Sequence, residues 1–465
     1  MEGDYPGSGS AVPGPIRNSF VNALIVALNQ IEMCDGGSWY TSTKELLLVS
    51  LEVCMACRTH QTMHLTIDPN IPRRLLAAAD ASPPYPKRVG DARVPRLKAR
   101  RVTWNMPTAE LWTNPIFALT DVDSLKFGSA FEGSLDAVAW PRRLKKIEFR
   151  ISSKFNQPID MVDWPHSLQT LEFGLKFNQP IKRVQFPTSL KRLVFDSGFD
   201  QQIDGGFLPS SLQELALGED FNQPIEDVAW PLSLRELCFG RFFNQPIERV
   251  RFPSSLQQLR FTPFCQFNQP IEGVLWPSSL KELIFEVEAG FNQPIERVVW
   301  PASLQQLTLR GAFDQPIEGV QWPDSLQGLL FGACFNQPID DVKWPSSMHE
   351  LTFGGCCTDE VHDEEDMIFM SSSFNQPIGS SVWPTSLRRL TLGESFRQSL
   401  QGLGTWMPNL EAFRLFEHVP DGNSLLRGIE WPKGLRQLTV CDGICLDGVV
   451  FPPSVEVVYP HVRFC

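Results

Sequence analysis

The sequence predicts a repeat solenoid, in which coils stack and each coil adds one strand to a single parallel β-sheet. The first observation is a spacing of 22 or 24 residues between successive copies of one pentapeptide, from Phe155 to Phe335. A fixed period in this range is the signature of stacked repeats. The second is a Leu-x-x-Leu-x-Phe frame that precedes most copies. Phe-Asn-Gln-Pro-Ile begins at Phe155, Phe177, Phe221, Phe243, Phe267, Phe291, Phe335 and Phe374, with looser copies at Phe199 and Phe313.

Each repeat contains one expected strand, which the copy at 221–243 illustrates. Leu237 and Phe239 are two residues apart, as the inward-facing positions of a strand are. Stacked coils place such strands about 4.8 Å apart in one parallel sheet. The same frame recurs at Leu168/Leu171/Phe173, Leu190/Leu193/Phe195, Leu256/Leu259/Phe261, Leu280/Leu283/Phe285, Leu304/Leu307/Leu309 and Leu326/Leu329/Phe331.

The segment that returns the chain to the next strand is short and rich in proline. Asn-Gln-Pro, Trp-Pro and Pro-x-Ser steps interrupt it in almost every copy. Proline does not fit a helix interior, and it pushes the preceding residue toward extended geometry. We therefore expect an extended return with a one-turn 3₁₀ segment near Pro231–Ser233. Ile225, Val228 and Trp230 are expected to close the core from behind.

The complete unit, WPxSLxxLxFGxxFNQPIExV, resembles the FNIP repeat, a short leucine-rich-repeat-like family. The resemblance is strong over about 155–392 and looser over 104–465. It implies a leucine-rich-repeat-like solenoid. Repeat arrays of this kind generally serve as interaction scaffolds, so the resemblance also implies non-catalytic protein binding.

The N-terminal part outside the repeat predicts a small helical unit. Phe20, Leu24, Leu28 and Ile31 have helical spacing, and a second helix is expected to start at Ser42, which has a capping-box partner three residues on. A third short helix is expected further along. The expected parts are 1–15 disordered, 16–80 a helical unit, 81–103 a basic Pro-rich linker, and 104–465 the solenoid with an acidic insertion at 355–373.

Composition limits the classes of function. The net charge of -12 argues against general nucleic-acid affinity. Eleven cysteines without paired spacing indicate reduced thiols and a cytoplasmic protein. The apolar run Ala23–Leu28 is far too short to span a bilayer, so no membrane anchor is expected. The basic stretch 87–101 leaves nuclear import or anion binding open.

Three columns of the repeat predict structural roles. The Asn of the pentapeptide is expected to be a buried amide ladder between coils, weakened at Asp200 and Asp314, which only accept hydrogen bonds when ionised. The Trp of Trp-Pro is expected to pack, because Phe and Leu replace it in some copies. The acidic residue after the pentapeptide, as in Glu226, is expected to be exposed, because stacked like charges repel.

The outward strand positions are the candidate binding face, because they vary where every structural column repeats. A varying column lets each coil present a different group to a partner. The candidate residues are Thr170, Glu172, Arg192, Val194, Glu214, Glu236, Cys238, Gln258, Arg260, Glu282, Ile284, Gln306, Thr308 and Leu330.

The predicted function is therefore a non-catalytic scaffold that binds a protein partner along the strand face, with no cofactor. One alternative is an adaptor whose residues 16–80 recruit a second protein. Another is an enzyme with a site in the N-terminal unit or the 355–373 loop, although no nucleophile elbow, phosphate loop or metalloprotease motif occurs. The set Cys54, Cys57, His60 and His64 has zinc-ligand residue types, but its spacing along one helix argues against a shared metal.

Overall fold

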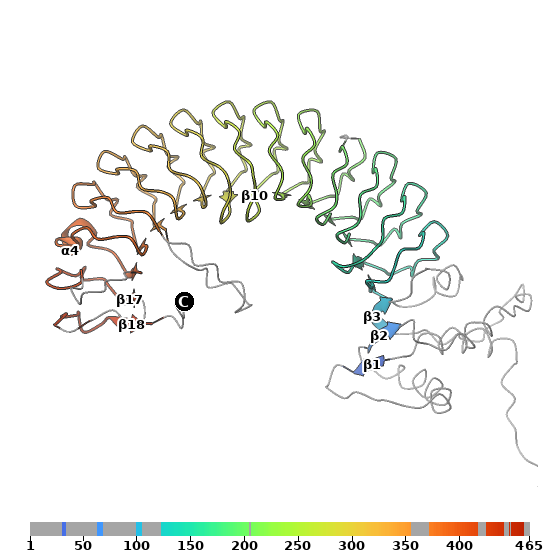
Figure 1. Cartoon of the computed structure of the whole chain (residues 1–465), viewed down its shortest axis with the longest axis horizontal. Helices are drawn as coiled ribbons and strands as arrows, with labels where there is room; N and C mark the ends of the chain where they lie inside the picture. Colours follow the sequence, from blue (N-terminus) through green and yellow to red (C-terminus); the bar gives the residue numbers. More distant parts are fainter. Residues whose placement is uncertain are drawn as a thin grey trace, which may run out of the picture. The chain divides into compact units, whose positions relative to one another are not determined.

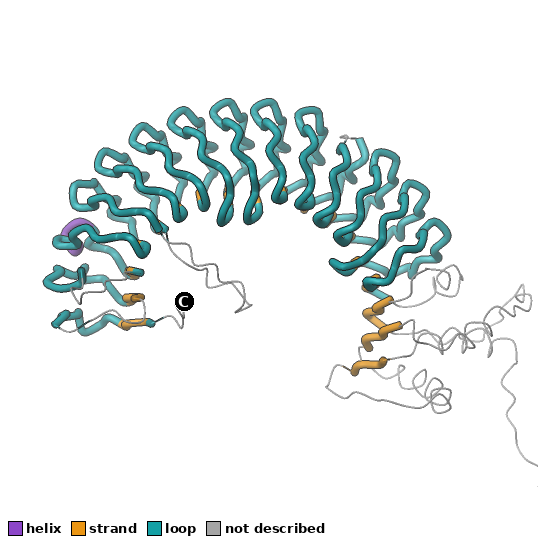
Figure 2. Tube along the Cα trace, in the orientation of Figure 1, coloured by secondary structure: helices purple, strands orange, loops and turns teal. Residues whose placement is uncertain are grey.

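A computed structural model describes the chain over 30–33, 63–67, 99–104, 122–203, 206–354, 372–416, 425–440, 446 and 448–459. The chain divides into two compact units, Met1–Phe199 and Asp200–Cys465. Both units are built from the same kind of coil, with one short strand and a long loop that returns to the next strand (Figure 2). We describe each unit by itself.

The first unit is a ladder of seven short described strands (Figure 1). β1 and β2 pair in antiparallel fashion, and the strands from β2 to β7 form parallel pairs between sequence neighbours, ending with the pair β6–β7. The strands are β1 (Gln30–Met33), β2 (Met63–Ile67), β3 (Ala99–Trp104), β4 (Ser124–Phe127), β5 (Lys146–Phe149), β6 (Thr170–Glu172) and β7 (Arg192–Val194).

The second unit continues the pattern with strictly parallel strands in register, each hydrogen-bonded to the next. The strands are β8 (Glu214–Ala216), β9 (Glu236–Phe239), β10 (Gln258–Phe261), β11 (Glu282–Phe285), β12 (Gln306–Leu309), β13 (Gly328–Phe331), β14 (Glu350–Phe353), β15 (Arg389–Leu392), β16 (Ala412–Leu415), β17 (Gln437–Val440) and β18 (Glu456–Val458). One helical turn, α4 (Leu403–Trp406), interrupts the return that leads to β16.

The expected helical unit at 16–80 is wrong where the structure describes it. Gln30–Met33, at the end of the first expected helix, is strand β1, and Met63–Ile67 is strand β2. Short apolar runs do not separate helix from strand by periodicity alone, and here the edge of the sheet supplies the deciding hydrogen-bond partners. β3 begins at Ala99, so the last residues of the expected linker also belong to the sheet. The sheet is not wholly parallel either, because of the β1–β2 pair.

The return segments are extended and bend at single turns, as the prolines predict. In the coil that leads to β9, Val228 N–H donates to Ile225 O at 3.3 Å and Leu234 N–H donates to Pro231 O at 3.0 Å. Each bond spans three residues and is not continued, so the segment forms isolated turns rather than a 3₁₀ helix. Gly240, directly after β9, permits close stacking, because a Cβ there would lie 2.2 Å from the Gly218 carbonyl oxygen of the preceding coil.

Stacked aromatic rings fill the interior. Phe239 at the end of β9 and Phe243 of the following pentapeptide have ring centroids 4.0 Å apart. Phe243 stacks on Phe267 of the next coil at 6.0 Å. The Trp column packs behind them, with Trp300 and Trp322 6.4 Å apart. The packing role predicted for Trp is confirmed. The indole N–H groups lack a hydrogen-bond partner at Trp164, Trp230, Trp276, Trp300, Trp322 and Trp344.

An asparagine ladder connects the coils. Asn222 Oδ1 accepts a hydrogen bond from Asn244 N at 2.9 Å and from Gln245 Nε2 at 3.0 Å. The asparagines are half-exposed or exposed rather than buried. The aspartates keep these contacts, because the side-chain oxygen serves as the acceptor; the weakening expected at Asp200 and Asp314 stays a prediction. Asp314 Oδ1 accepts from Asn336 N at 2.8 Å and from Gln337 Nε2 at 2.9 Å.

Candidate partner-binding face

The outward positions of the strands form two columns along each sheet. On β10, Leu259 and Phe261 are buried, whereas Gln258 and Arg260 are half-exposed. Cys238, Arg260, Ile284, Thr308 and Leu330 follow one another in register from β9 to β13. None of the fourteen candidate residues is buried; Arg192, Glu236 and Gln306 are exposed and the other eleven are half-exposed. Their accessibility allows binding, and their role in it stays a prediction.

In the first unit this face is occupied by a chain of ion pairs. Glu148 pairs with Lys126 of the neighbouring strand β4 and with Lys146 of its own strand β5, the latter at 3.2 Å. Lys146 also reaches Glu172 at 3.1 Å, and Arg192 lies 3.5 Å from Glu172. Sequence reasoning missed the two lysines and Glu148. The signal that could have found them is the strand frame of the degenerate coils, Leu125-x-Phe127 and Ile147-x-Phe149.

The ion pairs shift the pKa values of their members. Burial alone would raise the pKa of the Glu148 carboxyl, but hydrogen bonds and charges from Lys126 and Lys146 outweigh it and lower that pKa below 4.5. Burial alone would lower the pKa of Lys146, but Glu172 and Glu148 outweigh it and raise that pKa above 10.5. Both shifts favour the charged forms, so this part of the face is electrostatically satisfied at neutral pH.

The face of the second unit is more mixed. Gln258 Nε2 donates to Glu282 Oε2 at 2.5 Å, and Arg260 pairs with Glu286 at 2.9 Å. Ile284 lies in register between Arg260 and Thr308 and is half-exposed. Leu330 is also half-exposed and has a threonine beside it on each neighbouring strand. The surface therefore offers apolar side chains and charges side by side.

A rim beside this face consists of the turns that follow β9, β10 and β11, and the repeat step lengthens from 22 to 24 residues at the last two of these turns. Phe242 and Phe264 are exposed large hydrophobic residues in adjacent turns. The Arg241 guanidinium lies 5.4 Å from the Phe242 ring centroid and 5.8 Å from that of Phe264. Phe264 has a left-handed φ of 62°, and its N–H donates to Val287 O in the other long turn at 2.9 Å. The changed spacing was the sequence signal for this rim.

The thiol beside the rim is structural. Cys265 is buried and its Sγ–H donates to Gly240 O at 3.1 Å. Burial raises the pKa of this thiol to about 12, so it stays protonated and is a poor nucleophile.

Within the described ranges, no three His, Cys, Asp or Glu side chains group as a metal site. Of the four candidate zinc ligands, only His64 belongs to the described residues, where it is part of strand β2. Cys54, Cys57 and His60 lie outside the described residues.

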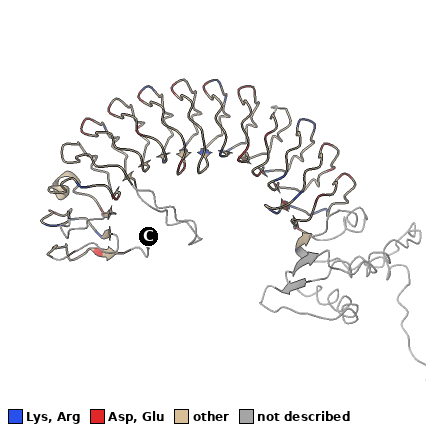
Figure 3. Cartoon of the chain, in the orientation of Figure 1, with Lys and Arg blue, Asp and Glu red and all other residues tan. Residues whose placement is uncertain are grey.

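The acidic stripe on the return segments is exposed as expected. Glu226, Glu248, Glu272, Glu296 and Glu318 all face solvent. Arg249 lies 3.5 Å from Glu226 of the preceding coil, so a cation partly offsets the repulsion. Both signs of charge are interspersed along the coils (Figure 3). The acidic insertion at 355–373 lies outside the described residues except for its last two positions.

The stacked coils, in-register strands and proline-bent returns define a leucine-rich-repeat-like solenoid. Within this class, the family profile described as FNIP Repeat matches four consecutive segments, 177–220, 221–262, 267–311 and 313–356. Residues 177–356 of the chain are therefore built from FNIP repeats. The residues between the second and third matches, 263–266, include Phe264 of the rim. The fold is typical of protein-interaction scaffolds.

The fold is similar to that of a solved leucine-rich-repeat structure, CroV588. CroV588, described as a novel circular LRR protein, is 29% identical with a TM-score of 0.57, and the alignment covers 77% of this chain and 53% of that chain. This chain thus spans about half the length of CroV588. A chain of the Toll–Spatzle complex of Drosophila aligns at 14% identity and a TM-score of 0.47, covering 81% and 57%. An internalin of Listeria monocytogenes aligns at 11% and 0.39, covering 74% and 87%.

No curated protein matches the chain. Among the described residues, no helix has the length and apolar character needed to cross a bilayer.

Proposed function

We propose that the protein is a non-catalytic scaffold that binds a protein partner along the strand face of the second unit, over β9–β13. The observation that carries the proposal is the contrast between a repeated interior and a varied, half-exposed strand face. The column Cys238, Arg260, Ile284, Thr308 and Leu330 contains five different residue types in register. A protein partner fits such a face better than a repetitive ligand does, because a repetitive ligand favours a repeated side chain.

The rim belongs to the proposed interface for a reason of area. Five strands of four residues cover roughly 24 Å by 13 Å, about 300 Å². A specific protein interface needs about 800 Å² on each side. The strand face alone is therefore too small, and the adjacent turns that carry Phe242 and Phe264 supply further apolar area. Arginine and aromatic residues are enriched among the residues that dominate binding energy. Both types meet in the rim, because the Arg241 guanidinium lies against the rings of Phe242 and Phe264.

The test places a photo-reactive residue at Ile284 in the full chain and identifies cross-linked proteins in a lysate. A matched control carries the same group at Glu272, on the exposed acidic stripe. We expect defined products from Ile284 that Glu272 does not give, and their loss when Phe264→Ser and Arg260→Glu are added. Equal products at both positions, or no effect of the two substitutions, would contradict the proposal.

A further inference from the structure

A row of serine side chains along the second unit is interrupted at one coil. In the regular coils the Ser of Pro-x-Ser donates its hydroxyl to a carbonyl oxygen of the preceding coil at 2.6 or 2.7 Å. The donors are Ser255, Ser279, Ser303, Ser325, Ser347 and Ser386, and the acceptors are Leu234, Leu256, Leu280, Leu304, Leu326 and Met348. In the next coil Asn409 keeps a bond of this kind, from Nδ2 to Thr385 O at 2.9 Å.

Gly434 occupies the same position in the following coil and has no side chain to donate. Its turn is otherwise regular, because Leu435 N–H donates to Pro432 O at 3.1 Å as Leu387 N–H does to Pro384 O. A Cβ at Gly434 would lie 3.6 Å from Leu410 O, an ordinary contact distance. Close packing therefore does not require a glycine at this position. The space beside Gly434 must have another role.

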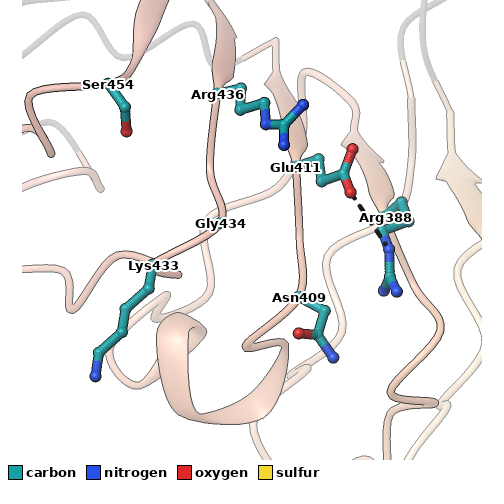
Figure 4. A pocket seen from close by; sticks show the side chains of 7 residues that line it. All are labelled: Arg388, Asn409, Glu411, Lys433, Gly434, Arg436 and Ser454. Carbon is teal, nitrogen blue, oxygen red and sulfur yellow. Dashed lines mark ion pairs between the residues drawn. The ribbon is translucent and has the colours of Figure 1, made fainter.

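A pocket of about 290 Å³ lies at this interruption, within the second unit. In Figure 4, Gly434 lies between Arg436 and Ser454 on one side and Lys433 and Asn409 on the other. The pocket is lined by Arg388, Asn409, Glu411, Lys433, Gly434, Arg436 and Ser454. Its volume falls at the small end of ligand pockets, which favours a small ligand.

The charges of the pocket favour an anion. It contains three cationic side chains and one carboxylate, a surplus of two positive charges, in a protein whose net charge is -12. Arg388 is already engaged, because it lies 3.4 Å from Glu411 and donates to Thr385 O at 2.9 Å. Arg436 and Lys433 have no ion pair or side-chain hydrogen bond within the described part of the chain. Asn409 has a second N–H beyond the one it gives to Thr385.

We propose that this pocket binds a phosphate group, either free phosphate or the phosphomonoester of a small organic molecule. A phosphomonoester carries about 1.5 to 2 negative charges at pH 7 and three acceptor oxygens, which match the charge surplus and the free donors. Arg436 is the main contact, because a guanidinium makes paired hydrogen bonds to phosphate. Lys433 is secondary, since its ammonium is turned away from Gly434 in Figure 4 and reaches the ligand by rotating its stem.

The test measures binding of inorganic phosphate and of O-phosphoserine to the full chain by calorimetry at constant ionic strength. We expect Arg436→Gln to lower the affinity at least tenfold and Lys433→Gln to lower it less. The matched control is Arg235→Gln, because Arg235 is exposed and holds the same position in its own coil. It is expected to bind like the wild type. Circular dichroism shows whether each variant is folded.

The outcomes separate clearly. Binding of either phosphate form that depends on Arg436 and not on Arg235 supports the site, and the stronger form identifies the source of the phosphate. Absence of binding to the wild type, or an equal loss in Arg235→Gln, overturns it. Gly434→Ser gives an independent readout: it restores the donor to Leu410 O, so we expect a higher melting temperature together with weaker phosphate binding. Unchanged phosphate affinity in that variant would contradict the role of the gap.

Discussion

The interior and the strand face of the same coils follow opposite rules. Along the interior, Phe243, Phe267 and Phe291 repeat one residue so that their rings stack at 6.0 to 6.1 Å. Along the face, Cys238, Arg260 and Ile284 lie in the same register and share no chemistry. Identical residues stack well in the interior, because each coil must fit both of its neighbours. A solvated position touches few atoms and therefore tolerates any residue. Repetition therefore marks the scaffold, and its absence marks where specificity can reside.

The strand faces of the two units also differ from each other. In the first unit the face groups satisfy one another through Lys126, Glu148, Lys146, Glu172 and Arg192. In the second, Glu286 also bridges Arg260 and Arg310, but Ile284 and Leu330 remain half-exposed apolar groups in the same column. Charged side chains that already pair with one another gain little binding free energy from a partner. Half-exposed apolar side chains do gain binding free energy, because a partner buries them. This difference is the reason for proposing that recognition resides in the second unit.

The largest effect is expected from an interior leucine. Leu283 on β11 is fully buried, and Leu283→Ala is expected to cost about 2–5 kcal/mol of unfolding free energy through lost contacts and a cavity. Its neighbour Ile284 points outward, so Ile284→Ala is expected to cost well under half as much. Denaturant unfolding of both variants measures the difference, and similar losses would remove the distinction between interior and face.

The asparagine ladder should respond to chemistry rather than to size. Asn244 Oδ1 accepts from Asn268 N and Gln269 Nε2, each at 3.0 Å. Asn244→Ala removes that acceptor from both donors, although Gln269 keeps its bond to the Asn244 carbonyl oxygen, and it is expected to cost about 0.5–1.5 kcal/mol because the ladder is partly solvated. Asn244→Asp keeps the acceptor and is expected to be nearly neutral.

Asn292→Asp is the matched control for that ladder, because it places a second carboxylate beside Asp314, whose N–H it binds. It should be less stable than Asn244→Asp through like-charge repulsion. Amide exchange of the two coils reports the difference. Equal stability of the alanine and aspartate variants at position 244 would show that the acceptor does not matter.

The ion pairs of the first unit should add a small, pH-dependent stability, below about 1 kcal/mol because the pairs are partly solvated. The Glu148 pKa is lowered from 4.5, so its contribution is present above that pH and declines as the pH falls through the lower folded-state pKa. Lys146 behaves oppositely: its pKa is raised from 10.5, so its contribution is lost at higher pH. Glu148→Gln is expected to flatten the acid limb of the stability–pH curve; an unchanged limb would contradict this.

The cysteines offer a comparison without a stability cost. Cys334 is exposed, whereas Cys265 is buried with a pKa raised to about 12. Site-resolved mass spectrometry after brief alkylation at pH 8 should show Cys334 modified and Cys265 protected until denaturant is added. Modification of Cys265 in the folded chain at the rate of Cys334 would show that the turn beside Phe264 opens readily.

Much of the fold could be predicted from the chain itself. The Leu234-x-x-Leu237-x-Phe239 frame gives β9, and its repeats give the neighbouring strands within a residue or two. The outward candidates also lie where the alternation of a strand requires. The N-terminal expectation failed because Met63–Ile67 becomes a strand by pairing with β3, a partner more than thirty residues away. No local pattern contains that information.

The sequence by itself determined the coil: its period, its strand and its extended return, because each depends on residues close together within one repeat. Only the tertiary structure decided what successive coils do together. It showed that Asp314 accepts the same two hydrogen bonds from the next coil as an asparagine does, because both bonds need only an oxygen acceptor. It also joined Arg241 to two phenylalanines, and Arg436 to the space left at Gly434. These features depend on distances between residues of different coils, and the sequence of a single repeat does not determine those distances.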